Sequence, residues 1–157
     1  MADYIKPVVF KLDTQEYGVD INLVSGIERY QQVVPVPNSV SFIKGIINLR
    51  GEVVPVYDLR KKFNMQPYQG EVENKSLIVV KISDVFVAIE VDAVSEIHDF
   101  GPDKIVKMPK IVVNEETKFM ERVANLDGRL IVLMDVTKLL SEEEIEGVKK
   151  LKEDLED

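Results

Sequence analysis

The chain has no cysteine, no tryptophan and a single histidine, His98, among its 157 residues. Without cysteine there is no disulfide, no thiolate nucleophile and no thiolate metal ligand. That absence fits a reducing cytoplasm. With one histidine, a nucleophile–histidine pair has only one possible centre. His98 ends a predicted strand, and we interpret it as an ordinary surface or loop histidine. A small β-barrel enzyme is therefore the disfavoured alternative.

Sequence signals for cofactors and metals are also missing. The eight glycines are scattered through predicted turns and form no glycine-rich phosphate loop. No spacing of histidine, aspartate and glutamate resembles a zinc site or a calcium-binding loop. We therefore expect no cofactor and no bound metal, and we predict that the protein is not an enzyme.

The chain has no long apolar run and no targeting signal. No run approaches the roughly eighteen residues of a membrane helix. The N-terminus, Met1–Pro7, lacks the basic start and apolar stretch of a secretory signal. We therefore expect a cytoplasmic protein with no direct membrane insertion.

Acidic residues outnumber basic ones, and the excess lies at one end. The formal net charge is −8, of which residues 141–157 contribute −5 through eight acidic residues and three lysines. A nearly balanced body with an acidic tail is the wrong pattern for a nucleic-acid partner. The few aromatic residues do not alternate with a basic stripe either. We interpret the tail as a solvated helix end in preference to a partner-docking helix.

The feature that is present is an internal repeat. Residues Asn48–Phe63 read Asn-Leu-x-Gly, an apolar run, aspartate and an apolar–basic close, and Asn125–Leu140 repeat this pattern 77 residues later. Upstream segments repeat with an offset of 70, so the halves cover about 8–65 and 76–140. Two copies are too few for a solenoid, which favours a pair of small units. The copies differ most at Arg50 and Asp127, which makes Arg50 a candidate functional residue.

Short β-branched segments with frequent turn residues predict an all-β fold, a small barrel or sandwich. Pro55 lacks the backbone donor of a sheet ladder, which predicts an edge strand at that position. The segment 101–117 is expected to be rich in loops. Each half supplies five predicted strands: Val8–Leu12, Tyr17–Ile21, Val24–Gln31, Ile46–Leu49, Val53–Tyr57, Leu77–Ile82, Val85–Val91, Val94–Asp99, Arg122–Leu126 and Leu130–Met134.

Both copies of the repeat predict a tight hairpin. Asp127-Gly128 lies between two apolar strands and fits a type I′ turn, in which both central residues have positive φ. Arg50-Gly51 occupies the same slot. We therefore expect Arg50 to project from a hairpin tip with a mildly strained left-handed backbone.

Helix starts are predicted at three places. Asp58 and Asp135 each follow a strand and suit an N-cap, where a carboxylate accepts from exposed amides of the first turn. Short helices should follow at Leu59–Phe63 and Val136–Leu140. Ser141, with glutamate three residues later, forms a capping box at the start of an acidic C-terminal helix, 141–157.

Several of these motifs together resemble the CheW-like domain family of bacterial chemotaxis coupling proteins. The resemblance is carried by Phe42–Gly51, Val54–Val56, Asp58–Arg60, Tyr17–Ile21 and Val91–Ile97, and it extends from about Val8 to Leu140. The same domain occurs at the C-terminus of the histidine kinase CheA, and in CheV with a receiver domain. No residues are left here for a kinase or receiver, so a free-standing coupler is expected.

The resemblance implies a single domain, 1–157, of two intertwined five-stranded SH3-like barrels with short helices and a C-terminal helix. It implies a non-enzymatic adaptor or scaffold for signal transduction, of the two-component type. Its partners would be the regulatory domain of CheA and the cytoplasmic tips of transmembrane chemoreceptors, at receptor arrays beneath the inner membrane. A coupling protein of a non-motility chemosensory pathway is the alternative within the same class.

For the site, the resemblance implies receptor binding by Arg50, Val24, Leu49 and Gly51, in a groove between the barrels. The family often has an acidic residue two positions after Val24, where this chain has Gly26. That departure weakens the case for an arginine–acid pair in this chain. No motif fixes the residues that would face the kinase.

Overall fold

The structure, a computed structural model, describes residues 6–37, 42–112, 114 and 117–156. It contains two compact units. Unit 1 comprises the described residues up to Val24 together with Ala93–Leu139, and unit 2 comprises Ser25–Asp92 together with the described residues from Leu140 onward. Two expectations concern residues outside the described part. The expectation for the N-terminus involves residues 1–5, and the predicted C-terminal helix ends at residue 157.

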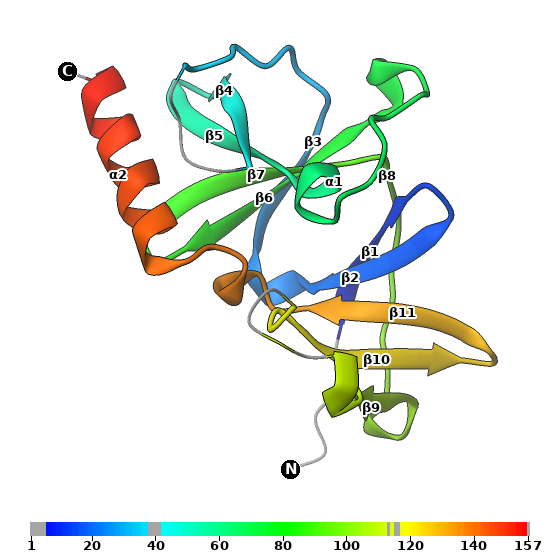
Figure 1. The fold of residues 1–157 in the computed structure, drawn as a ribbon. Helices are drawn as coiled ribbons and strands as arrows, with labels where there is room; N and C mark the ends of the chain where they lie inside the picture. The colour runs from blue at the N-terminus through cyan, green and yellow to red at the C-terminus, as the bar shows by residue number, and fades with distance from the viewer. Residues whose placement is uncertain (1–5, 38–41, 113, 115–116, 157) are drawn as a thin grey trace. The chain divides into compact units, whose positions relative to one another are not determined.

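Each unit is built on one sheet (Figure 1). The sheet of unit 2 has five strands in the order β3-β6-β7-β5-β4. These strands are β3 (Val24–Arg29), β4 (Ile43–Leu49), β5 (Glu52–Asp58), β6 (Ser76–Ile82) and β7 (Val85–Val91). The all-β prediction is confirmed, and each predicted strand is present with bounds shifted by three residues or fewer.

The sheet of unit 1 has six strands in the order β8-β1-β2-β11-β10-β9. These strands are β1 (Pro7–Leu12), β2 (Gln15–Asp20), β8 (Ala93–Ile97), β9 (Ile105–Lys107), β10 (Met120–Leu126) and β11 (Arg129–Met134). The sixth strand, β9, was not among the predicted strands and lies in the segment 101–117 that was expected to be loop-rich. It pairs with β10 over only three residues, from Ile105 to Lys107, too few to give a visible alternating pattern.

The units exchange strands between the two sequence halves. Unit 1 takes β1 and β2 from the first half, and β2 pairs with β11 of the second half in parallel. Unit 2 takes β6 and β7 from the second half, and β7 pairs with β5 of the first half in parallel. Both sheets are therefore intertwined along the chain, as the resemblance implied.

Pro55 is not on an edge strand, because β5 lies between β7 and β4. Pro55 is opposite Ile46 of β4, and both backbone polar groups of Ile46 bond Val34 instead. The backbone nitrogen of Pro55 therefore faces the β7 side, where pairing begins only at Val56. The absence of a backbone N–H at Pro55 costs no stability there, because no hydrogen bond between strands is lost.

The sheet of unit 2 is strongly curled. Arg50 at the β4–β5 turn bonds Glu28 of β3 at 2.8 Å, although β3 and β4 are the two outer strands. In a flat sheet these strands would be roughly 19 Å apart. In unit 1, Arg129 of the inner strand β11 bonds both Glu16 of the neighbouring β2 and Glu96 of the outer strand β8. The contact between the outer strands of unit 2 fits the barrel-like fold that the resemblance implied.

The predicted hairpin turns are confirmed. Arg50 and Gly51 have φ of 52° and 87°, and Asp127 and Gly128 have 52° and 89°, as a type I′ turn requires. The asparagine that opens each copy of the repeat closes the turn: its side-chain oxygen accepts from the glycine N–H, at 2.9 Å in unit 2 and 3.0 Å in unit 1.

The predicted caps are confirmed as well. Asp58 accepts from the N–H of Lys61 at 3.0 Å and starts α1 (Leu59–Lys62). Asp135 accepts from the N–H of Thr137 at 3.1 Å and starts a single 3₁₀ turn, Val136–Lys138, which is shorter than predicted.

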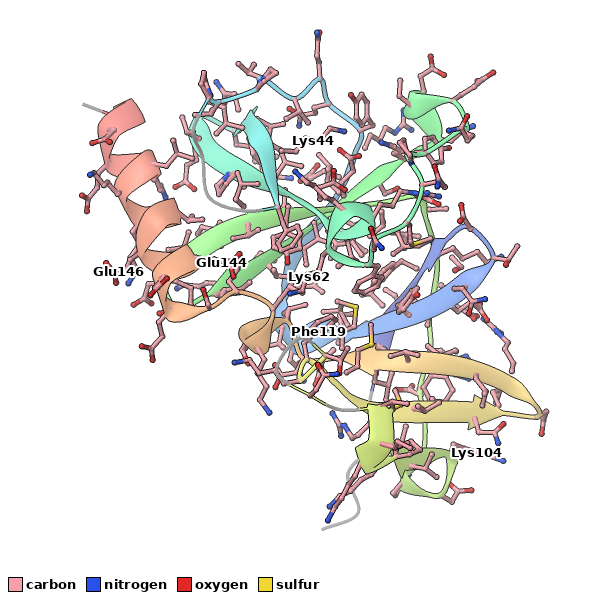
Figure 2. The ribbon with its side chains drawn as sticks, viewed as in Figure 1. Lys44, Lys62, Lys104, Phe119, Glu144 and Glu146 are labelled. Carbon is pink, nitrogen blue, oxygen red and sulfur yellow. The ribbon has the colours of Figure 1, made fainter. Side chains whose placement is uncertain are left out.

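The C-terminal helix α2 (Glu142–Glu156) begins with the predicted capping box. Ser141 Oγ accepts from the N–H of Glu144 at 3.1 Å, and the Glu144 carboxylate accepts from the Ser141 N–H at 3.0 Å. Val148 is fully buried, and the helix packs on β5 and β7 of its own unit. Figure 2 shows Glu144 on the sheet side of α2 and Glu146 on the other side.

Candidate functional site: a groove beside Arg50

Unit 2 contains a groove of about 330 Å³ between β3 and the β4–β5 hairpin. Its polar rim and apolar floor come from both outer strands and from the strands between them. The lining residues are Ser25, Gly26, Glu28, Leu49, Arg50, Glu52, Val54, Val79 and Phe86. The groove lies wholly within unit 2.

The apolar floor is the edge of the unit's own core. Val54 and Val79 are almost completely buried members of the core cluster, and Leu49 and Phe86 pack against that cluster while staying partly exposed. Because the sheet curls, these side chains face inward from several strands at once. The groove therefore offers apolar surface to a partner without disturbing the fold.

The rim is charged, and Arg50 is an exposed member of it. The Arg50 side chain is 79% exposed and its Nη2 lies 2.8 Å from Glu28 Oε1. Glu28 is on the same face of β3 as Gly26, since alternate residues of a strand share a face. Arg50 therefore has an acidic partner despite Gly26, because Glu28, two residues further along β3, supplies the carboxylate.

The structure brings two of the four expected site residues into the groove. Arg50 and Leu49 line it. Gly51 is exposed at the hairpin tip beside Arg50. Val24 is half-buried at the start of β3 and belongs to unit 1. It does not line the groove.

Sequence reasoning missed the acidic rim and the aromatic floor. Glu28 and Phe86 were identified only as parts of the predicted strands Val24–Gln31 and Val85–Val91. Period-2 alternation along β3 could have grouped Glu28 with Gly26. Its contact with Arg50 depends on how far the sheet curls, which no local pattern encodes.

A second hollow of unit 2, about 440 Å³, holds a buried ionic cluster rather than an open reactive group. Glu90 is 7% exposed and accepts from two lysines: Lys44 at 3.0 and 3.1 Å, and Lys75, which is also 7% exposed. Figure 2 labels Lys44. Burial alone would lower the pKa of Lys44, but the hydrogen bonds and charge of Glu90 outweigh it and raise that pKa. Beside it, Arg60 binds both carboxylate oxygens of Asp92, at 2.9 and 2.7 Å.

No arrangement in the described residues suggests a reaction. His98 lies against Phe100, with ring centroids 4.6 Å apart, and its Nδ1 is 3.9 Å from Glu96. Within the described ranges, no group of three or more histidine, aspartate or glutamate side chains could hold a metal ion. None of the helices described here is long and apolar enough to cross a membrane. What the arrangement offers is a binding surface.

Comparison with known proteins agrees with the fold. The family model of the CheW-like domain matches residues 6–144. Chemotaxis protein CheW of Klebsiella aerogenes is 38% identical over 138 residues, covering 88% of this chain and 82% of that protein. The crystal structure of the scaffolding protein TtCheW from Thermoanaerobacter tengcongensis matches with a TM-score of 0.78 at 32% identity, covering 90% of this chain and 96% of that chain.

A longer chemotaxis protein also contains a related region. Chemotaxis protein CheA of Borreliella burgdorferi is 33% identical over 138 residues, which is 86% of this chain but only 15% of CheA. The CheW relatives, by contrast, match over most of their own length. From the family match over most of its length, and from the two intertwined sheets, this chain belongs to the CheW-like domain family.

Proposed function

We propose that this protein is a non-enzymatic adaptor that couples chemoreceptors to the histidine kinase CheA in chemotaxis. The observation that carries the proposal is the match to the CheW-like domain over residues 6–144, together with relatives named as chemotaxis and scaffolding proteins. A scaffold needs surfaces rather than reactive groups, which fits a groove with an apolar floor and a charged rim.

The kinase side of the proposal rests on shared ancestry. CheA of Borreliella burgdorferi contains a stretch similar to this chain. We take that domain of the kinase, the regulatory domain, as the part that this adaptor binds, through contacts between similar barrels. Residues 1–157 would act as one adaptor domain, in the cytoplasm at receptor arrays.

The receptor side of the proposal rests on Arg50. This side chain is 79% exposed at a hairpin tip, in the one slot where the two copies of the repeat differ most. A guanidinium presents a planar fork that pairs with carboxylates or with helix-end carbonyls. Arg50 and Leu49, with Gly51 at the same hairpin, would form the surface of unit 2 that receives the cytoplasmic tip of a receptor.

Bridging is the property that tests this proposal. The full chain is mixed with the regulatory domain of CheA and with a soluble receptor-tip fragment, singly and together, and complexes are measured by sedimentation velocity. We expect a binary complex with each partner and a ternary complex when all three are present, because receptor and kinase use different surfaces. A chain that binds neither partner, or binds them only in competition, would contradict the adaptor role.

A further inference from the structure

The second hollow of unit 2 has more positive than negative charge in its lining. Four cationic and two anionic side chains line it: Lys44, Arg60, Lys61, Lys75, Asp58 and Glu90. Arg60 is compensated by Asp92, which accepts from it through both carboxylate oxygens. Three lysines then remain against two carboxylates, so the described lining has an excess of one positive charge.

A buried ammonium group contributes to this excess. Lys75 is 7% exposed and shares the carboxylate of Glu90 with Lys44, which is 37% exposed. Both oxygens of Glu90 accept from Lys44, and one of them also accepts from Lys75. One carboxylate therefore serves two ammonium groups. Such an arrangement costs stability unless a further anion completes it, because a buried charge needs its own compensation.

Aromatic rings hold Lys75 in position without supplying the missing charge. Lys75 Nζ lies 4.8 Å from the ring centroid of Tyr68 and 5.9 Å from that of Tyr30. The Tyr68 hydroxyl donates to the backbone oxygen of Glu71 at 3.0 Å, which fixes the ring. Cation–π contacts attract an ammonium group but use none of its N–H donors in ordinary hydrogen bonds. Of the three donors of Lys75, one bonds Glu90 within the described part of the chain, so two can serve a ligand.

The rest of the lining is apolar and leaves room for more than a single ion. Met65, Pro67 and Val72 line the hollow together with the ring of Tyr68. The volume of about 440 Å³ falls in the range of sites for small organic molecules, about 300–1,000 Å³. A ligand that matches both parts of the lining has an anionic head and a compact apolar body.

We propose that this hollow is a binding site for a small phosphate monoester, with the phosphate at Lys44, Lys61 and Lys75 and the apolar body against Met65 and Val72. Lysine binds phosphate as a mobile point charge. The three terminal oxygens of a phosphate monoester can accept from three ammonium groups at once, whereas a carboxylate has only two oxygens. The ligand is bound and not converted. The site is independent of the proposed adaptor role, since the protein alone should bind the ligand.

Calorimetry on the full chain at constant ionic strength tests the site, with phenyl phosphate, inorganic phosphate and benzoate as probes. Phenyl phosphate should bind with a stoichiometry of about one, as expected for one site of this size. Its affinity should exceed that of inorganic phosphate at least about threefold, because the ring is removed from water. It should exceed that of benzoate by a similar factor, because phosphate carries more negative charge.

Lys75→Met removes the buried charge while keeping an unbranched apolar side chain of similar length. It should weaken binding of phenyl phosphate at least about tenfold, because the excess positive charge is lost. The melting temperature should stay level or rise, because Lys44 still bonds both oxygens of Glu90.

A matched pair of neighbours on α1 provides the control. Lys61 lines the hollow, whereas Lys62 does not, and its Nζ lies 5.1 Å from the ring centroid of Phe42. Lys61→Gln should weaken phenyl phosphate binding about threefold or more, and Lys62→Gln should change it by less than about twofold.

Three results would overturn the proposal. One is no saturable binding of phenyl phosphate to the wild-type chain, and another is equal affinity for phenyl phosphate and benzoate, which would make the site unselective for phosphate. The third is equal weakening by Lys61→Gln and Lys62→Gln, which would indicate general attraction to a basic surface. If Lys75→Met fails to fold, the lysine serves the fold, and the pair Lys61→Gln and Lys62→Gln decides the question alone.

Discussion

Arg50→Asp should abolish most receptor binding while leaving the fold intact. The substitution removes the exposed guanidinium and places a negative charge where an acidic receptor group is expected, so affinity should fall about tenfold or more, a loss of about 1.4 kcal/mol per factor of ten. Aspartate suits the backbone there, because Asp127 occupies the same turn slot with the same φ of 52°. The pair with Glu28 is exposed and contributes only about 0–1 kcal/mol. Calorimetry with the receptor-tip fragment and a thermal melt measure the two effects.

Lys149→Asp is the charge-matched control for Arg50→Asp. Lys149 is 38% exposed on α2 of the same unit and does not line the groove, so reversing its charge should change receptor affinity by less than about twofold at physiological salt. The account of Arg50 is contradicted if both variants weaken binding equally, or if Arg50→Asp melts far below the wild type. The first result would indicate a general charge effect, and the second would make Arg50 a structural residue.

Glu90→Gln should be the most destabilising of these substitutions. Glu90 and Lys75 are each 7% exposed, and Lys44 bonds the same carboxylate. Removing one member of a buried ion pair leaves the other charge without compensation, which costs about 3–5 kcal/mol. The free energy of unfolding, measured in urea, should therefore fall by about 3 kcal/mol.

Two comparisons separate the buried cluster from a general effect of removing an acid. Glu146→Gln makes the same chemical change where the side chain is 76% exposed, and it should alter stability by less than about 0.5 kcal/mol. Lys75→Met combined with Glu90→Leu removes both buried charges, and should recover most of the loss because apolar pairs often replace buried ion pairs at little cost. If Glu90→Gln is as mild as Glu146→Gln, the cluster contributes little to the fold.

Local chemistry in the sequence predicted the parts of this fold that depend on near neighbours. The two type I′ turns follow from Arg50-Gly51 and Asp127-Gly128, whose φ values are positive as expected. The caps at Asp58 and Asp135 follow from an aspartate placed after a strand. Each of these features is decided within about four residues, which is why a single sequence was enough.

The local sequence pattern did not predict which strands pair when they lie far apart in the sequence. The parallel pairing of β2 with β11 joins residues more than a hundred positions apart, and nothing in the alternation of either strand names its partner. The expected edge position of Pro55 failed for the same reason. Its missing donor does face an unpaired side, but that side belongs to an inner strand whose pairing with β7 begins one residue later.

The candidate site was predicted in part. Arg50 was identified because the repeat supplied an internal comparison with Asp127, and Leu49 lies beside it in the groove. Glu28 was missed because it belongs to the opposite edge of the curled sheet. The groove is therefore a product of curvature, and curvature depends on the packing of all five strands rather than on any one segment.

The account as a whole depends on coupling, and kinase activity measures coupling most directly. Purified CheA is incubated with ATP and receptor assemblies, with and without this chain, and the rate of CheA autophosphorylation is recorded. We expect the chain to change that rate strongly when receptors are present and little when they are absent, and Arg50→Asp to lose the receptor-dependent part. An autophosphorylation rate with receptors that is the same with and without the wild-type chain would contradict the adaptor function.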